Sequence, residues 1–368
     1  MKIFWLFNHP APYKVSLFNE LGRKLDLTVC FERKQEKGRN AIFYGEEAQT
    51  FSVVPITSIP FGAFDNYTHG PISYLKKHHK EFDLIVINGW RTLTEQRTIA
   101  YLKRHKIPYV FYINGGIIKP NDSGLARRLK RKHIPGAMAY FAPDDNSAAY
   151  LKHYGAEGPI YLYPYASVYE KEILKVPYSE EETKKERERL GIVGEKVFVS
   201  SSQFIARKNN EQLLRIFEKM PENCSLYLIG EGEEKENYQR IIKEMKHKNV
   251  FLLEYKDHAS LFEFYRCCDC FVTLSKEDIY GHTVNEALSQ GLPVICSDQV
   301  NSGKHLLQNG INGFVVSLEN EEAILDALNY PFGEANRLAA IKSSEANTYE
   351  AMAKFHQEAF ASILEKRG

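Results

Sequence analysis

The stretch SKEDIYGHTVNEALSQGLPVICSD, residues 275–298, decides the fold, because it has the pattern of a strand end, a loop, a helix and the next strand. We expect the helix from about Thr283 to Gln290. Gly291 is the natural left-handed cap of such a helix, and Pro293 opens the following strand. A strand, a crossover helix and a second strand in this order predict a parallel sheet of the α/β class.

Two carboxylates accompany this expected helix. Its N-terminus offers free N–H groups and the positive end of the helix dipole, which suit a phosphate. Glu286, on the first turns, can accept both hydroxyls of a ribose, and Asp278, eight positions earlier, can reach a sugar beyond a diphosphate. The spacing alone fits equally well a generic capped helix with a solvated Glu286.

The same alternation of short apolar runs with amphipathic stretches continues through all 368 residues. It predicts two doubly wound, Rossmann-like units, each a parallel sheet with crossover helices. In the first half we expect strands at residues 2–7, 27–31, 84–88, 109–113, 139–142 and 160–163. In the second half we expect them at residues 197–201, 225–229, 250–253, 270–274, 293–296 and 313–316.

A domain boundary is expected near residues 167–178, where Pro164 and Pro177 punctuate a stretch that turns strongly charged. Ligands of open α/β sheets bind outside the carboxyl ends of the strands, so we expect a central cleft between two facing sheets. The expected parts are an N-terminal domain at 1–168, a C-terminal domain at 169–346 and a terminal helix at 347–368 that packs back on the first domain.

Charge and hydropathy exclude several classes of protein. The chain has 48 basic and 47 acidic residues, so no overall field attracts nucleic acid. The apolar run in MKIFWLFNHP is too short for a signal peptide, and no later run approaches the roughly 20 apolar residues of a membrane span. We therefore expect a cytoplasmic protein. The first turn lacks Gly-x-Gly-x-x-Gly, which argues against a NAD-dependent oxidoreductase.

The six cysteines are few for this length, and in a reducing compartment we expect free thiols. Cys267, Cys268 and Cys270 cluster, but a metal site would need a second ligand pair at suitable spacing. We expect buried thiols that end a helix and open a strand, with no metal and no cofactor.

Residues 275–298 resemble the signature of the GT-B retaining glycosyltransferases of family 4, in which a Glu, any residue, Phe and Gly precede, after four residues, Glu-Ala and then Gly-x-Pro-Val. The matching positions are Asp278, Tyr280, Gly281, Glu286, Ala287, Gly291, Pro293 and Val294. Four further segments resemble successive parts of the same family in the same order along the chain. They are FAPDDNSAAYLKHYGAEGPIYLYPYAS, VSSSQFIARKNNEQLL, LIGEGEE and NVFLLEYKDHASLFEFYRCCDCFVTLSKED.

The resemblance implies transfer of a sugar from a nucleoside diphosphate with retention of configuration, without a metal or a protein base. Lys208, helped by Arg207, and the backbone at Gly281–Thr283 would stabilise the departing diphosphate. The catalytic residues it implies are Lys208, Asp278, Glu286 and Asn114. The sugar-donor site it implies in the second domain comprises Gln203, Arg207, Lys208, Gly230, Glu254, Tyr255, Lys256, Glu277, Asp278, Gly281, His282, Thr283 and Glu286.

Three positions depart from the family pattern. Asn114 stands where many relatives have His, Gln203 stands where Arg is usual, and Asp278 replaces Glu, with Glu277 beside it as an alternative. These changes bear on the choice of donor sugar. They also leave open a catalytically silent GT-B subunit that binds nucleotide or serves as a scaffold.

The N-terminal loop NHPAPYKVSLFNEL and the later FERKQEKGRNAIFY resemble a bacterial subgroup that builds surface polysaccharides such as capsule. We expect Asn8, Tyr13 and Lys14 near the acceptor, a simple strand-to-helix turn being the alternative. The sequence thus predicts a hexosyltransferase that uses a nucleotide sugar, with UDP as the expected nucleotide, and extends a lipid-linked glycan.

The segment ARRLKRKH, residues 126–133, concentrates positive charge in two helical turns. It predicts either a solvated helix face or a contact with anionic lipid head groups through Arg127, Arg128, Lys130, Arg131 and Lys132. The second interpretation implies a peripheral position on the inner face of the cell membrane and suits a lipid-diphosphate-linked acceptor.

Overall fold

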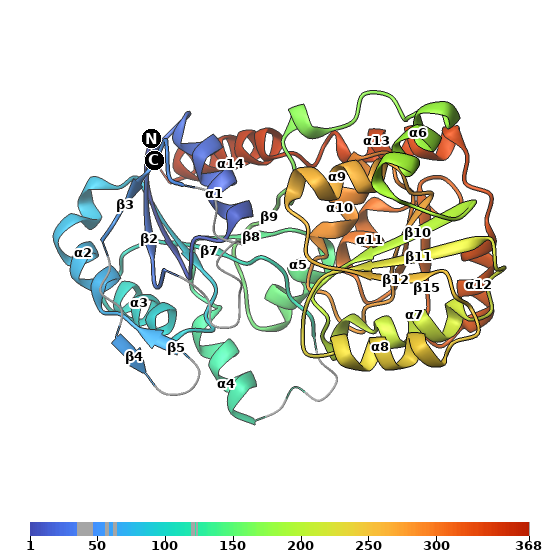
Figure 1. Ribbon diagram of the computed structural model, residues 1–368. Helices are drawn as coiled ribbons and strands as arrows, with labels where there is room; N and C mark the ends of the chain where they lie inside the picture. Colours follow the sequence, from blue (N-terminus) through green and yellow to red (C-terminus); the bar gives the residue numbers. More distant parts are fainter. Residues whose placement is uncertain (35–46, 56–58, 62–64, 119–121, 123, 368) are drawn as a thin grey trace. The chain divides into compact units, whose positions relative to one another are not determined.

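The computed structural model describes residues 1–34, 47–55, 59–61, 65–118, 122 and 124–367; most of FERKQEKGRNAIFY lies outside the described residues. The chain forms two compact units (Figure 1). We call Met1–Ala166 with Tyr349–Gly368 the first domain and Ser167–Thr348 the second domain. The terminal segment therefore belongs to the first domain.

The first domain contains a seven-stranded sheet in the order β3-β2-β1-β6-β7-β8-β9, with every pair of neighbours parallel. Its strands are β1 (Lys2–Phe7), β2 (Asp26–Phe31), β3 (Ser52–Val53), β6 (Leu84–Asn88), β7 (Val110–Tyr112), β8 (Ala139–Ala142) and β9 (Ile160–Leu162). A separate antiparallel pair is formed by β4 (Ile59–Phe61) and β5 (Asp65–Tyr67).

Helices cover both faces of this sheet (Figure 1). They are α1 (Pro12–Gly22), α2 (Gly70–His78), α3 (Leu93–Arg104), α4 (Gly124–His133), α5 (Asp145–His153) and α14 (Tyr349–Glu365), with a 3-10 turn η2 (His79–Glu81). Successive residues of β1 point to opposite faces. Trp5 packs against Phe18 of α1 and Phe360 of α14, whereas Phe4 packs against Tyr74 of α2.

The second domain contains a six-stranded parallel sheet in the order β12-β11-β10-β13-β14-β15. The strands are β10 (Lys196–Ser201), β11 (Cys224–Ile229), β12 (Val250–Leu253), β13 (Cys270–Thr273), β14 (Val294–Ser297) and β15 (Gly313–Val316). Its helices are η3 (Glu170–Glu172), α6 (Glu180–Leu190), η4 (Ala206–Lys208), α7 (Asn210–Phe217), α8 (Lys235–Glu244), α9 (His258–Arg266), α10 (His282–Ser289), α11 (Asn301–Leu306), α12 (Glu321–Asn329) and α13 (Glu334–Ser344).

Two hydrophobic clusters hold this domain together, one on each face of the sheet. Val197 and Val199 of β10 join the cluster that contains residues of α9, α10 and α13. Phe198, between them, joins the cluster with residues of α7, α8 and α12. Because both faces are covered, the strands are nearly continuous apolar runs, as expected for a parallel sheet.

The structure confirms the doubly wound fold and finds each expected strand within one residue of its expected start or end. The strands β3, β4 and β5 were not predicted, since they are two or three residues long. Helix α10, expected to end at Gln290, ends one residue earlier at Ser289. Gly291 has a φ of +71°, in the left-handed region, as predicted. The six cysteines are buried free thiols, as predicted.

His356 of α14 is buried in the aromatic core of the first domain. Its ring packs against Trp5, Tyr112, Phe141 and other aromatic rings, and its Nδ1 lies 2.6 Å from the carbonyl oxygen of Met352. Burial, and to a smaller extent the charge of Lys14, lowers the pKa of His356 to about 3. The imidazole is therefore neutral in the folded protein at every pH near neutrality.

We predict that His356 makes the first domain sensitive to acid. Below its unfolded pKa of 6.5 the unfolded chain binds a proton that the folded domain does not bind, so stability is lost as the pH falls. At pH 5 this loss is about 2 kcal/mol relative to pH 8. His356→Asn, which keeps a donor near Met352, is less stable at pH 8, but the gap to wild type narrows by about that amount at pH 5.

Urea unfolding followed by tryptophan fluorescence measures this effect, because the two tryptophans of the chain, Trp5 and Trp90, both lie in the first domain. His153→Asn on the exposed surface is the control and should leave the pH dependence unchanged. A gap between His356→Asn and wild type that stays constant from pH 8 to pH 5 would contradict the prediction.

Candidate functional site

The N-terminus of α10 follows β13 through a loop that only glycine can complete. Gly281 is the N-cap residue, with a φ of +94°, and has no side chain to cap the helix. A β-carbon on Gly281 would lie 2.6 Å from Cγ1 of Val300 and 2.9 Å from Oγ of Ser302. The first N–H groups of α10 thus have no side-chain cap, and they carry the positive end of the helix dipole at the carboxyl edge of the sheet.

A cation and a carboxylate meet beside this loop. Nζ of Lys208, the last residue of η4, lies 2.5 Å from Oδ2 of Asp278, and only 12% and 16% of their side chains are exposed. The amide N–H of Lys276 donates to the carbonyl of Arg207 at 2.8 Å, and Nη1 of Arg207 donates to the carbonyl of Glu277 at 3.1 Å. Two further hydrogen bonds beside the ion pair therefore join the two loops.

Glu286 is half-buried on α10. Burial raises the pKa of this carboxyl, the negative charge of Glu172 raises it further, and the positive charges of His258 and Lys208 oppose the rise. The predicted pair of carboxylates, Asp278 and Glu286, therefore shares one electrostatic neighbourhood with Lys208. Such a group of side chains can hold hydroxyls and a phosphate side by side.

Glu172 and His258 are functional candidates that the sequence did not reveal. His258 Nε2 lies 3.4 Å from Oε1 of Glu172, and Oε2 of Glu172 accepts a hydrogen bond from the N–H of Tyr169 at 2.7 Å. Glu172 belongs to the stretch expected only as a domain boundary. No spacing rule links it to α9, so only the folded chain brings the two residues next to Glu286.

The Gly-x-Gly turn after β11 allows close packing of the loop at residues 202–204. A β-carbon on Gly230, whose φ is +151°, would lie 1.9 Å from the carbonyl oxygen of Ser202, and one on Gly232 would lie 2.3 Å from that of Phe204. Both glycines thus allow the loop that carries Gln203 to pack against β11. Gln203 itself is exposed.

Three more residues of the expected sugar-donor site follow β12. Glu254 and Tyr255 are exposed, Tyr255 by 52%, and Nζ of Lys256 lies 5.6 Å from the ring centroid of Phe264. The pKa of the Tyr255 phenol is raised first by burial and then by the charge of Glu286, so this loop faces the same neighbourhood. His282 and Thr283 are half-buried in the first turn of α10.

In the first domain, the expected residues also lie at the carboxyl edge of the sheet. Asn8 follows β1, and its Oδ1 accepts a hydrogen bond from the N–H of His9 at 2.9 Å. Asn114 follows β7, and its Oδ1 is buried without a hydrogen-bond partner among the described residues. The same holds for Oδ1 of Asn88, at the end of the neighbouring β6, which the sequence analysis missed. Two unused acceptors thus stand on adjacent strands.

Lys14 has an environment that the sequence did not predict. It is fully buried, and its Nζ donates to the hydroxyl of Tyr112 at 3.1 Å. The ring centroids of Tyr165 and Tyr112 lie 4.6 Å and 4.7 Å from Nζ, and those of Phe7, Tyr13 and Tyr163 lie within 5.8 Å. Burial holds the pKa of Lys14 well below its usual value. Of these residues, Tyr13 alone is more than slightly exposed.

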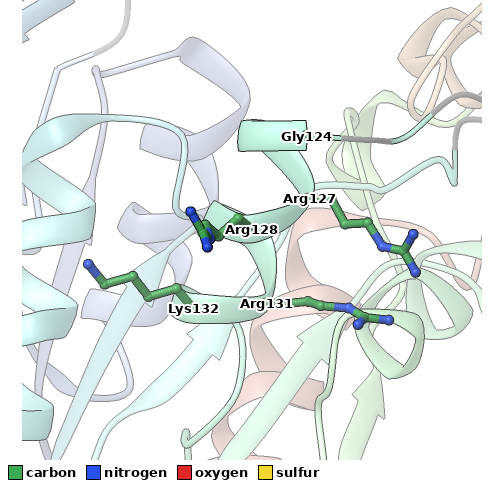
Figure 2. Close-up of a pocket in the computed structure, with 5 residues that line it drawn as sticks. All are labelled: Gly124, Arg127, Arg128, Arg131 and Lys132. Atoms are coloured by element: carbon green, nitrogen blue, oxygen red, sulfur yellow. The ribbon is translucent and has the colours of Figure 1, made fainter.

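The basic helix α4 forms a second candidate surface (Figure 2). A cavity of about 460 Å³ is lined by Gly124, Arg127, Arg128, Arg131 and Lys132. Arg127 and Arg131 extend to one side of the helix, and Arg128 and Lys132 extend to the other. Within the described part of the chain, none of these four side chains has an ion-pair partner.

Lys130 does not belong to this exposed surface, contrary to the sequence-based expectation. Its Nζ contacts Oδ1 of Asp122 at 2.9 Å and the hydroxyl of Tyr154 at 3.1 Å, and 12% of its side chain is exposed. The reason is helical spacing, since position 130 faces inward when 127, 128, 131 and 132 face outward. Leu125, by contrast, is 71% exposed.

The described residues contain neither a metal-binding cluster nor a membrane-spanning helix. Over residues 1–34, 47–55, 59–61, 65–118, 122 and 124–367, no three His, Cys, Asp or Glu side chains are grouped so that they could hold a metal ion. In the same ranges, no helix combines the length and the apolar character needed to cross a bilayer.

The second domain is similar to known glycosyltransferases. Residues 182–343 match the family model described as "Glycosyl transferases group 1". An uncharacterized glycosyltransferase of Methanocaldococcus jannaschii is 30% identical over 140 residues, which are 37% of this chain and 31% of the relative. The N-acetylgalactosamine-N,N'-diacetylbacillosaminyl-diphospho-undecaprenol 4-alpha-N-acetylgalactosaminyltransferase of Campylobacter jejuni is 23% identical over 135 residues, 36% of each chain. The alignments thus span about a third of these curated relatives.

Among solved structures, Anabaena HepE in complex with UDP is similar over 98% of this chain and 100% of its own, with a TM-score of 0.76 and 17% identity. This likeness concerns the fold. The two Rossmann-like domains have the GT-B fold, and residues 182–343 of the second domain match the group 1 glycosyltransferase model.

We predict that Gly281→Ala destabilises the second domain. The substitution combines a left-handed φ, which costs about 1 to 2 kcal/mol for a residue with a β-carbon, with the 2.6 Å contact to Val300. Gly191→Ala is a matched control, because Gly191 also has a positive φ, +67°, but nothing lies within 4 Å of its added β-carbon.

Hydrogen exchange of the amides of α10 and α11, measured by mass spectrometry, tests this prediction. Gly281→Ala should accelerate exchange in both helices, whereas Gly191→Ala should lower overall stability without a selective effect there. Equal protection of α10 in wild type and Gly281→Ala would refute the role assigned to the glycine.

Proposed function

We propose that this protein transfers a sugar from a nucleoside diphosphate, a UDP-sugar, to a glycan acceptor, and that the second domain binds the sugar donor. The observation that carries the proposal is the group formed by Lys208, the uncapped N-terminus of α10 and Glu286 within a group 1 glycosyltransferase domain. The similar fold of HepE binds UDP, which supports the choice of nucleotide.

The reaction needs stabilisation of negative charge. When the bond from the anomeric carbon to the diphosphate breaks, the leaving oxygen takes the electron pair. Lys208, Arg207 and the N–H groups at the start of α10 meet that charge in our proposal, and loss of one such contact costs about 2.7 to 4 kcal/mol of transition-state stabilisation. The acceptor oxygen attacks from the same face, its proton passes to a phosphate oxygen, and configuration is retained.

The carboxylates and amides then position the ligands. Glu286 accepts hydrogen bonds from the ribose hydroxyls, and Asp278 reaches hydroxyls of the transferred sugar. Asn114 supplies an amide rather than a titratable group to the sugar, and its unused Oδ1 is compatible with that role. No metal ion is required, since the positive charge comes from side chains and the helix dipole.

For the acceptor we propose a lipid-linked glycan of bacterial surface polysaccharide synthesis. The name of the Campylobacter relative includes a diphospho-undecaprenol acceptor, which supports this class. Asn8 and Tyr13, at the carboxyl edge of the first domain's sheet, are the proposed acceptor-side residues.

We further propose that α4 contacts an anionic membrane surface. Leu125, Arg128 and Lys132 are spaced three and four residues apart and so share one helical face. An exposed leucine beside cations suits the boundary between head groups and acyl chains better than it suits a dissolved anion. The ion pair of Lys130 with Asp122 fixes the helix that presents them.

We predict that Lys208→Ala and Glu286→Gln each weaken UDP binding strongly. Hydrogen bonds to charged groups contribute about 1.5 to 3 kcal/mol, so the dissociation constant should rise roughly 10- to 150-fold. Isothermal calorimetry measures it, with Lys243→Ala, on the exposed side of α8, as the control that should bind like wild type. Unchanged affinity in both site variants would remove the basis for this sugar-donor site.

The same proteins separate an enzyme from a scaffold. Wild type should release UDP slowly from a UDP-sugar into water, and Lys208→Ala should not. Nucleotide binding without any turnover across a panel of sugar donors and acceptors would instead favour a silent binding subunit.

We predict that Arg128→Gln with Lys132→Gln weakens binding to vesicles of phosphatidylcholine with phosphatidylglycerol. Each basic residue near such a surface contributes about 1 kcal/mol, so the partition coefficient should fall roughly 30-fold. Cosedimentation measures it, and Lys184→Gln with Lys185→Gln on exposed α6 removes the same charge elsewhere. Equal losses in both double variants would show that total charge, not α4, governs binding.

A further inference from the structure

The carboxylate of Asp278 stands where the proposed sugar donor would place a phosphate. It lies 2.5 Å from the ammonium of Lys208, the cation that the proposed function assigns to the diphosphate. It also lies close to the start of α10, because a β-carbon on Gly281 would be 3.7 Å from its Cγ. A single carboxylate thus lies beside both positive features of the anion site.

The backbone holds Asp278 in this place. Its N–H donates to the carbonyl of Gln299 at 3.0 Å, and its carbonyl accepts from the N–H of Asn301 at 3.4 Å, so that it forms a parallel bridge with Val300. The loop of Lys208 is hydrogen-bonded to Lys276 and Glu277, which directly precede Asp278. The backbones of both Lys208 and Asp278 are therefore held in place. The contact is therefore built into the fold and is not a chance meeting of two long surface side chains.

Low exposure strengthens the pair relative to a surface salt bridge. Side chains that are 12% and 16% exposed have lost most of their water, and each needs the opposite charge beside it. A ligand that takes Lys208 must therefore supply at least as much negative charge as the carboxylate it replaces. A diphosphate does so, with about two negative charges in a UDP-sugar and about three in UDP, whereas an uncharged nucleoside does not.

We propose that Asp278 is an internal substitute for the phosphate of the sugar donor. In the free protein it neutralises Lys208 and faces the N-terminus of α10, and the incoming diphosphate displaces it. The displaced carboxylate is then free to accept hydrogen bonds from the transferred sugar. This inference rests on the proposed function only for the identity of the ligand.

An aspartate suits both positions. The carboxylate carbon of Asp278 is bonded directly to its Cβ. The carboxylate therefore stays near the bridge with Val300 while it contacts Lys208. A longer glutamate would carry the charge past this point. The substitution that departs from the family pattern thus makes the free anion site self-neutralised, and donor binding becomes an exchange of one anion for another.

The test compares Asp278→Asn with wild type in calorimetric titrations of UDP, a UDP-sugar, uridine and inorganic diphosphate at one ionic strength. UDP and inorganic diphosphate should bind at least about five-fold tighter to Asp278→Asn, because no carboxylate competes for Lys208 and even an exposed ion pair contributes up to about 1 kcal/mol. Uridine should bind equally to both proteins. The UDP-sugar should gain less than UDP, because the variant loses its contact with the sugar.

Two further variants guard the interpretation. Glu244→Gln removes the same charge from the exposed surface of α8 and should leave the affinity for UDP within two-fold of wild type, about the limit for a change without direct contact. Asp278→Ala removes the carboxylate without offering an amide and should also tighten UDP binding. Thermal unfolding of each variant shows that the compared proteins are folded.

The outcomes separate this inference from the proposed function. If wild type binds UDP and both Asp278 variants bind it equally or more weakly, the internal substitute is refuted and the sugar-donor site stands. If no protein binds UDP, yet Asp278→Asn binds inorganic diphosphate more tightly than wild type, the substitute stands and the proposed nucleotide is wrong. Failure of every protein to bind either anion overturns the inference together with the site.

Discussion

Parallel strands cannot be joined by tight turns, and this constraint organises both domains. Each strand needs a crossover that returns the chain to the opposite edge of the sheet, and a helix is the usual crossover. Every such helix then starts at the edge where the strands end, so helix N-termini collect there; those of α3, α5 and α9 have side-chain caps, whereas that of α10 has none. The loop of Gly281 before α10 and the loop of Asn114 after β7 both lie at such an edge. The candidate site residues therefore lie at the edge where the topology gathers helix N-termini.

The sequence was sufficient for the features that depend on local pattern. The strand positions follow from short apolar runs, and the end of α10 follows from Gly291, whose backbone needs the left-handed region. The resemblance to a known family supplied the order of the motifs, and the motifs from residue 199 onward lie in the second domain on the expected strands and helices. The strand positions, the end of α10 and the motifs could be predicted because each depends on the residues of a single short segment.

Features that depend on contacts between distant segments were not predicted. The pairing of Glu172 with His258 joins a 3-10 turn to a helix 86 positions later, and no periodicity marks it. Lys14 looked like a loop cation, but Tyr112 and Tyr165, about 100 and 150 positions away, enclose it. The sequence did not distinguish Lys130 from the four other cations of α4, but in the structure Lys130 alone of the five contacts Asp122 and Tyr154 among the described residues. A charged residue in a sequence carries no sign of whether a partner will reach it.

The second domain is an insertion in the first, since α14 completes the first domain after the whole of Ser167–Thr348 has intervened. On the ribosome, one face of the first sheet therefore stays uncovered while the entire second domain is made. Trp5 and Phe141 have no contact with Phe360 until Phe360 is synthesised, about 200 residues after the last strand of that sheet. The second domain, whose residues are contiguous, can fold as a unit during synthesis, whereas the first can be complete only afterwards. The order in which the domains can be completed is thus the reverse of the order in which they begin.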